Sequence, residues 1–266
     1  MNGKYTLKDP IFRSGLVAGS EAGIVMPLET KMVVVGGGAT QLYLGQESDL
    51  LRSTTDVDFF SRHPTGKTER RAWAKYAADI MKRQGYETAR GGLSRYGAEV
   101  RFDDVLPAFL VHLDTWGNNF FQQHERWIHG EFERARISKI DGGTVHYISP
   151  LDVMVGKIHR VEQIRKHRER AFNTYQTNFF DKLKDAQFDD VDTTRLDQNL
   201  LEIERERAQT LEDLGRFGYR EIIDKFDCYK IDKDIQDITT LIEAMRAKGE
   251  RIDKHDFRSI CKEALE

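Results

Sequence analysis

The chain has 266 residues, of which 39% are hydrophobic and 32% charged, and its formal net charge is −3. This length can bury a sizeable core, as one large domain or two domains of common size. Its apolar runs are shorter than the roughly 20 residues that cross a bilayer, and its first residues lack the layout of a secretory signal. We therefore expect a soluble, cytoplasmic protein with no membrane partner, and the small net charge excludes a molecule that is basic all over.

Six short runs in the first part of the chain predict β-strands, because they are apolar or alternate between apolar and polar residues. The runs are MVVV (32–35), VDFF (57–60), AEVRF (98–102), FLVHL (109–113), ARISKI (135–140) and TVHYI (144–148). Between them, residues 69–85 carry apolar side chains at helical intervals and end at Gly85, which predicts a helix. Residues 1–149 are therefore predicted to form an α/β (α+β) domain, a mixed sheet with helices.

The pattern changes at the sequence SPLDVMVGKIHR (149–160). Ser149 is a good N-cap and Pro150 suits the first helical position, so a helix is predicted to begin there. The segments that follow are long and charged, with apolar residues at mostly three- and four-residue steps between Leu196 and Leu214. Residues 150–266 are predicted to form a second, mostly helical domain.

A glycine triplet, residues 36–38, directly follows the first predicted strand. Glycines let a backbone approach phosphate closely, and the start of the next helix favours an anion. Position 41 is Gln, which excludes a GxGxxG dinucleotide fingerprint, and no GxxxxGK[ST] motif follows, which excludes a P-loop. Farther along, His124 and His129 are five residues apart, so HERWIH (124–129) does not have the spacing of a zinc-protease helix.

Asp56 and Asp58 flank Val57 in the second predicted strand. Residues i and i+2 of a strand point to the same side, so the two carboxylates project together while Val57 and Phe59 face the core. Adjacent carboxylates repel each other unless a hard divalent cation, usually Mg²⁺, offsets the repulsion. A phosphate-binding turn upstream and a metal-binding pair downstream are typical of nucleotidyl transfer.

These motifs resemble the DNA polymerase beta-type nucleotidyltransferase superfamily, whose signature is a strand, a Gly-Gly or Gly-Ser pair, a helix and Asp-x-Asp. The closer match is the AbiEii-like toxin branch and its relatives, where the segment runs close to GGTALALxLG…R-x-T-x-D-h-D. The matching positions here are Gly36, Gly37, Gly38, Ala39, Leu44, Gly45, Arg52, Thr54, Asp56, Val57 and Asp58. Gly38 stands where the family usually has Thr or Ser, so one hydroxyl that could reach phosphate or metal is missing.

The superfamily also implies a third carboxylate on a neighbouring strand. We predict Asp114, which ends the apolar run FLVHL. Glu99 and the pair at 103–104 are alternatives, and a solvent-facing strand or turn would equally account for them.

Two later blocks extend the resemblance. The first block is SPLDVMVGKIHR (149–160), which is similar to a family helix whose lysine reaches the nucleotide phosphates. Lys157 occupies the place of that lysine, and Arg160 follows one helical turn later on the same face. The second block, 230–253, is similar to the family's closing helix, where Asp234 and Asp237 match an acidic pair that we interpret as packing and capping residues. The basic run at 157–170 is either a solvated helix face or a surface that attracts a polyanion such as tRNA.

The resemblance implies a Mg²⁺- or Mn²⁺-dependent nucleotidyltransferase that moves an NMP from an NTP to a hydroxyl group of RNA, tRNA or protein. Many members of the branch are toxins of toxin–antitoxin or phage-defence systems, so a cognate antitoxin is an expected partner. The alternatives are an antibiotic-type small-molecule nucleotidyltransferase and a non-catalytic nucleotide-binding protein. Asp56, Asp58 and Asp114 would bind metal and catalyse, and the nucleotide would contact Gly36, Gly37, Gly38, Arg52, Thr54, Lys157 and Arg160.

Overall fold

The computed structural model describes residues 5–27, 31–94, 97–102, 109–115, 118–168 and 225–265, with only the backbone for some of them, including 160–168 and 225–232. The chain divides into two compact units, Met1–Val153 and Met154–Glu266. The division falls inside helix α5 (Pro150–Arg168), shortly after the domain boundary predicted at 149. The two units are described separately below.

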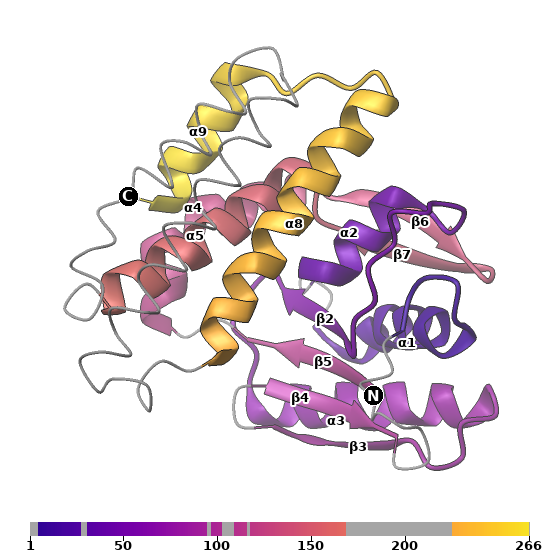
Figure 1. Cartoon of the computed structure of the whole chain (residues 1–266). Helices are drawn as coiled ribbons and strands as arrows, with labels where there is room; N and C mark the ends of the chain where they lie inside the picture. The colour runs from indigo at the N-terminus through magenta and orange to yellow at the C-terminus, as the bar shows by residue number, and fades with distance from the viewer. Residues whose placement is uncertain are drawn as a thin grey trace. The chain divides into compact units, whose positions relative to one another are not determined.

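The first unit contains a seven-stranded mixed sheet with the strand order β3-β4-β5-β2-β1-β7-β6 (Figure 1). Strand β2 pairs antiparallel with β1 and parallel with β5, and β1 pairs parallel with β7. This sheet confirms the predicted α/β fold, and each of the six predicted strands is present to within one residue at either end. The strands are β1 (Met32–Val34), β2 (Asp56–Ser61), β3 (Arg90–Leu93), β4 (Gly97–Arg101), β5 (Leu110–Asp114), β6 (Arg136–Ile140) and β7 (Gly143–Tyr147).

Among the described residues before α5, five helical segments accompany this sheet. They are α1 (Pro10–Glu21), the 3-10 helix η1 (Ala22–Val25), α2 (Gly36–Leu44), α3 (Lys67–Arg83) and α4 (Asn118–Glu133). The helix predicted at 69–85 is confirmed as α3, and Gly85 follows it with a φ of 96°. Helix α4 was not predicted. It is kinked at His124, whose φ of −120° is not helical, and a kink interrupts the periodicity on which helix prediction depends.

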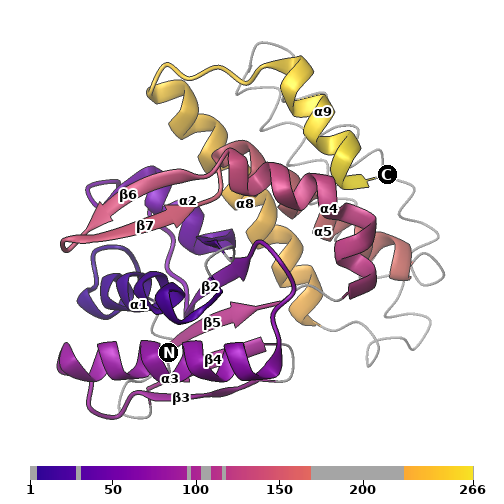
Figure 2. The same cartoon turned by 180° about the vertical axis from the view of Figure 1, so that it is seen from behind.

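Helices α1 and α3 cover one face of the sheet (Figure 2). Phe59 of β2 is fully buried there, and α1 lies so close that a Cβ atom added at Gly19 would be 2.3 Å from the Phe59 ring. The indole N–H of Trp73 in α3 donates to the Gly19 carbonyl at 3.0 Å, which ties α3 to α1. Because Val57 and Phe59 are fixed on the helix-covered face, Asp56 and Asp58 must face the other way.

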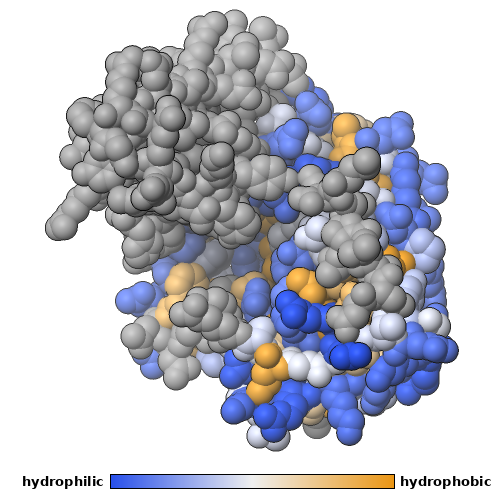
Figure 3. Space-filling view, turned by 60° about the horizontal axis from the view of Figure 1, so that its bottom comes forward, coloured by the Kyte–Doolittle hydropathy of each residue, from blue (hydrophilic) through white to orange (hydrophobic). Residues whose placement is uncertain are grey.

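Most large apolar residues of the described chain are buried. Those exposed are Ile24, Leu50 and Ile137. Among the residues coloured in Figure 3, most are hydrophilic, and the apolar ones stand in small separate groups. In the part of the chain that the structure describes, no helix offers an apolar stretch that could cross a membrane.

The second unit contains the rest of α5 together with α8 (Lys225–Ala247) and α9 (Lys254–Leu265). Helices α8 and α9 bury residues at three- and four-residue steps, as amphipathic helices do: Ile238, Leu241, Ile242, Met245, Phe257, Ile260, Cys261 and Ala264. Asp253 caps α9, since its Oδ1 accepts from the backbone N–H groups of His255 and Asp256 at 2.8 and 2.9 Å.

A buried polar cluster lies where α5 begins. Ser149 Oγ accepts from the Asp152 N–H at 3.2 Å, as predicted for an N-cap, and its hydroxyl donates to Asp152 Oδ2 at 2.5 Å. The Arg134 guanidinium donates to both oxygens of Asp152, at 2.6 to 3.2 Å. Glu131 lies near this pair, and burial raises its pKa well above the usual range; the Asp152 carboxylate raises it further and Arg134 opposes both.

Close packing of α1 predicts that Gly19→Ala destabilises the protein. The added methyl group would overlap the Phe59 ring, and overpacking of this kind costs about 1–3 kcal/mol of unfolding free energy. Gly156→Ala in α5 is the matched control, because nothing lies within 4 Å of its added Cβ. The control should gain about 0.5–1 kcal/mol from helix propensity. Urea titration measures both changes, and equal effects would contradict the close contact.

The Glu131 cluster predicts a pH-dependent stability. Because the folded pKa is raised, the stabilising contribution is full below the unfolded value near 4.5 and is lost as the pH rises through the folded pKa. Glu131→Gln keeps the shape without the titration, so the unfolding free energy of the parent should fall relative to this variant as the pH increases. Glu133→Gln, at an exposed carboxylate of the same helix, should follow the parent at every pH. If the unfolding free energies of Glu131→Gln and the parent changed in parallel with pH, Glu131 would not have the raised pKa assigned to it.

Candidate metal centre

The two aspartates of β2 lie on the face of the sheet opposite to α1. Exposure alternates along the strand: Val57 and Phe59 are fully buried, whereas Asp56 and Asp58 are half-buried. The predicted alternation is therefore confirmed. We call this side of β2, β4 and β5 the carboxylate face, and it carries Asp56, Asp58, Glu99, His112 and Asp114.

Asp56 and Asp58 are joined by a residue that was not predicted, His112 of β5. Asp58 is paired with His112 in the register of β2 and β5. Possible ligand atoms of Asp56, Asp58 and His112 all lie within 4.8 Å of one another. Two ligands of one ion at about 2.1 Å are at most about 4.2 Å apart, so small side-chain rotations would bring all three onto one cation. The donor set fits a divalent metal ion.

Thr54 holds one of these carboxylates in position. Its hydroxyl donates to Asp56 Oδ1 at 2.6 Å, and the residue is itself fixed by a β-bridge to Tyr5, with hydrogen bonds of 2.6 and 2.8 Å. Thr54 was predicted to contact the nucleotide. That contact stays a prediction, and the hydrogen bond to Asp56 is of the kind that orients a metal ligand.

The glycine triplet forms the first turn of α2 and reaches the same carboxylates. Gly36 has a φ of 56°, a conformation that favours glycine. A Cβ atom at Gly36 would lie 3.9 Å from Asp58 Oδ2, and one at Gly37 would lie 3.9 Å from Thr54 Oγ1. The N-cap residue of α2, Val35, makes no side-chain hydrogen bond to the N–H groups of the first turn. N–H groups that could bind an anion are therefore adjacent to carboxylates that could bind a metal ion.

The structure accounts for glycine at position 38. Gly38 is buried, and a Cβ atom there would be only 2.8 Å from Val34 Cγ1 in β1. The Thr or Ser that the resembled family carries at this place would collide with Val34. Close packing of α2 against β1 thus explains the departure from the family pattern.

Arg52 lies in the loop that precedes β2, and this loop is tied to α2. Its carbonyl accepts a hydrogen bond from Gln41 Nε2 at 3.1 Å, and Gln41 Oε1 accepts one from the Leu7 N–H at 2.6 Å. The contact of Arg52 with phosphate stays a prediction. Arg160 lies in α5, but its side chain is outside the described part, as are residues 103–104.

Asp114 and Glu99, the two candidates for the third carboxylate, both lie on the carboxylate face. Burial raises the pKa of Asp114, with His112 lowering it and Asp56 raising it. Glu99 is paired with His112 in the register of β4 and β5, and its Oε2 lies 4.0 Å from His112 Nδ1. Neither carboxylate belongs to the close group around Asp56 and Asp58. The choice of Asp114 stays a prediction.

Lys157, predicted to neutralise phosphate, is 4% exposed and lies in a buried ion triad of the second unit. Its ammonium donates to Asp234 Oδ1 at 3.1 Å and to Asp237 Oδ2. The two aspartates interpreted as packing and capping residues are thus the partners of this lysine. The contact of Lys157 with phosphate stays a prediction, and phosphate would compete with these two buried carboxylates for the ammonium.

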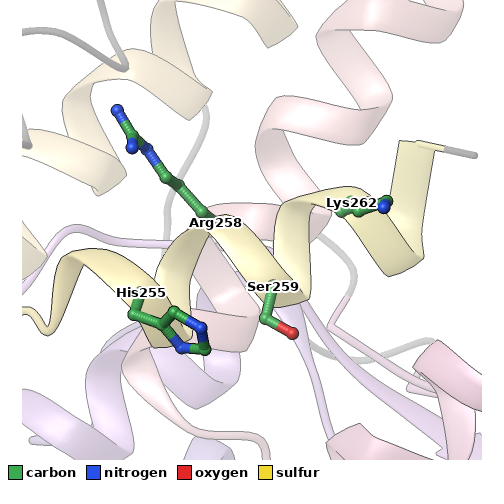
Figure 4. Close-up of a pocket in the computed structure, with 4 residues that line it drawn as sticks. All are labelled: His255, Arg258, Ser259 and Lys262. Atoms are coloured by element: carbon green, nitrogen blue, oxygen red, sulfur yellow. The ribbon is translucent and has the colours of Figure 1, made fainter.

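A separate cavity of about 450 Å³ lies on α9, lined by His255, Arg258, Ser259 and Lys262 (Figure 4). Its four lining residues all come from one helix, and all are exposed. Two of them are basic, which would favour an anion, and His255 also forms a group with Asp253 and Asp256 whose possible ligand atoms lie within 4.8 Å of one another, but all three are exposed. The carboxylate face is the better candidate.

No family model matches the chain, and no curated protein matches it. Among solved structures, the chain is similar to the solution structure of the antibiotic-resistance factor ANT(2'')-Ia, with a TM-score of 0.35 and 16% identity, over 59% of this chain and 75% of that chain. It is also similar to the crystal structure of an antigenic nucleotidyltransferase-like protein from Paracoccidioides brasiliensis, with a TM-score of 0.36 and 16% identity, over 76% of this chain and 92% of that one. Both are distant likenesses.

The Thr54 hydrogen bond predicts that Thr54→Val weakens divalent metal binding. Valine keeps the shape but removes the donor that orients Asp56, and losses of outer-shell partners cost about tenfold or more in metal affinity. Thr54→Ser keeps the hydroxyl and should bind as the parent does. Titration of each protein with Mn²⁺, following the free ion by electron paramagnetic resonance, measures the difference. Equal affinities for the valine and serine variants would show that this hydrogen bond does not support a metal ligand.

Proposed function

We propose that the protein is a Mg²⁺- or Mn²⁺-dependent nucleotidyltransferase that moves an NMP from an NTP to a hydroxyl group of an acceptor. The observation that supports this function best is the position of the first turn of α2. Gly36 and Gly37 lie beside Asp58 and Thr54, so N–H groups that suit phosphate adjoin carboxylates that suit its metal ion.

Each residue of this arrangement has a part in the proposed reaction. Asp56 and Asp58 hold the metal, which when bound would neutralise the triphosphate and polarise the α-phosphorus. The backbone N–H groups at 36–38 and the Arg52 guanidinium bind phosphate oxygens. A carboxylate oxygen of Asp114 accepts the proton of the attacking hydroxyl. Pyrophosphate is the leaving group.

For the acceptor we propose RNA, tRNA or a protein, and for the setting a toxin with a cognate antitoxin in the cytoplasm. The support for this is the resemblance of the motifs to the AbiEii-like branch, together with the basic run at 157–170, whose side chains beyond His159 are outside the described part. An antibiotic-type acceptor and a non-catalytic nucleotide-binding protein are the outcomes that the experiment must separate.

The test is incubation of the protein with each labelled NTP and Mg²⁺ or Mn²⁺, in the presence of total RNA, a protein extract or small hydroxyl-bearing compounds. We expect label in the RNA or the protein fraction. Asp56→Asn with Asp58→Asn should reduce the transfer by about a thousandfold, since several kcal/mol of metal-dependent stabilisation are lost. Asp49→Asn, at a fully exposed carboxylate, is the matched control and should keep the parent rate.

The other outcomes have distinct meanings. Label in the small compounds alone would favour the antibiotic-type activity. Metal-dependent NTP binding without transfer to any fraction would favour the non-catalytic protein. Undiminished transfer by the double variant would contradict the proposed site.

A further inference from the structure

We propose that His112 is a metal ligand, that Glu99 positions its ring, and that the centre therefore binds Mn²⁺ more tightly than Mg²⁺. This inference rests on the metal centre of the proposed function and names the ion that it prefers. Three neighbouring strands carry the argument, because β2, β5 and β4 place Asp58, His112 and Glu99 in one row across the carboxylate face.

The first step is the distance between His112 and the two aspartates. Directly paired residues on adjacent strands lie close together, so the imidazole of His112 is beside the Asp58 carboxylate. A nitrogen of the ring is within 4.8 Å of carboxylate oxygens of both Asp56 and Asp58. Asp114, two residues farther along β5, is paired with Phe60 instead and is not part of this group.

The second step is the orientation of the ring. His112 Nδ1 lies 4.0 Å from Glu99 Oε2, and Glu99 Oε1 is held by Arg101 Nε at 3.0 Å. Histidines that bind metals commonly direct their other ring nitrogen at a carboxylate, which fixes the tautomer and raises the basicity of the ligating nitrogen. At 4.0 Å the two atoms are not hydrogen-bonded, and a small rotation of the side chains would let Nδ1 donate to Glu99 and leave Nε2 for the cation. Glu99 is thus a positioning residue.

The third step is the choice of metal. Mg²⁺ prefers an all-oxygen octahedral set, whereas imidazole nitrogen suits transition metals. A centre of two carboxylates and one imidazole accommodates Mn²⁺, which accepts both donor types. His112→Gln replaces the imidazole nitrogen with an amide oxygen. This change should therefore remove most of the preference for Mn²⁺ over Mg²⁺, while the two carboxylates still bind Mg²⁺.

A different reading of the same geometry is that His112 only packs beside Asp56, Asp58 and Glu99 and does not bind metal. The two readings differ in one direct observable, because only a ligating nitrogen couples magnetically to the unpaired electrons of bound Mn²⁺.

The experiment is pulsed electron paramagnetic resonance of Mn²⁺ bound to the full chain without nucleotide. We expect a ¹⁴N coupling of histidine type in the parent and in His146→Gln, a control at an exposed position of β7. His112→Gln should lose the coupling and should lower the Mn²⁺-to-Mg²⁺ affinity ratio about tenfold. Glu99→Gln should keep the coupling but bind Mn²⁺ about tenfold more weakly.

Two results would overturn the inference, and they are distinguishable. If Mn²⁺ binds the parent, is lost in Asp56→Asn with Asp58→Asn, and shows no ¹⁴N coupling, the metal centre stands but His112 is not a ligand. If Mn²⁺ binding is unchanged in that double variant, the proposed centre itself fails. The parent spectrum decides the first point, so the inference stays testable even where His112→Gln does not fold.

Discussion

The packing of β2 against α1 is the constraint on which the site depends. Phe59 fills the space left by the missing side chain of Gly19, so the strand cannot shift by one residue without moving Phe59 out of the core. A one-residue shift would also turn Asp56 and Asp58 inward, where unpaired carboxylates are very costly. Core packing and carboxylate placement therefore reinforce each other. The same alternation in β5 places His112 beside Asp58.

Two buried carboxylate clusters of the protein are held by cationic side chains. Asp152 is bound by the Arg134 guanidinium, and Asp234 and Asp237 share the Lys157 ammonium, so the protein supplies a positive charge in both clusters. Asp56 is bound by the Thr54 hydroxyl, which donates a hydrogen bond but brings no charge. The first turn of α2 adds partial positive charge beside Asp58.

Much of this fold could be predicted from the sequence because its strands follow simple alternation. The position of Asp56 and Asp58 on one face followed from the alternation of side chains along a strand. The start of α5 was predicted from Ser149, a residue type that commonly caps helices. Strand β3 was missed, since two of its four residues are glycines and give no apolar signal. Helix α1 was missed as well, because Gly15 and Gly19 have low helix propensity. The close approach of α1 to the sheet accounts for both glycines, since a Cβ atom at either position would collide with strand side chains.

The site residues that the sequence did not reveal are those whose role depends on pairing between strands. His112 and Asp114 share a face of β5 by alternation, but only the register of β2 and β5 shows that His112, and not Asp114, stands opposite Asp58. Lys157 illustrates the opposite case: its motif suggested a phosphate contact, and the partners that bury its charge lie about 80 residues away in sequence. A local motif identifies the type of residue that a site needs, whereas long-range pairing decides which such residue is available to a ligand. The imidazole of His112 lies beside Asp58 in the register of β2 and β5, whereas the Lys157 ammonium is held by Asp234 and Asp237.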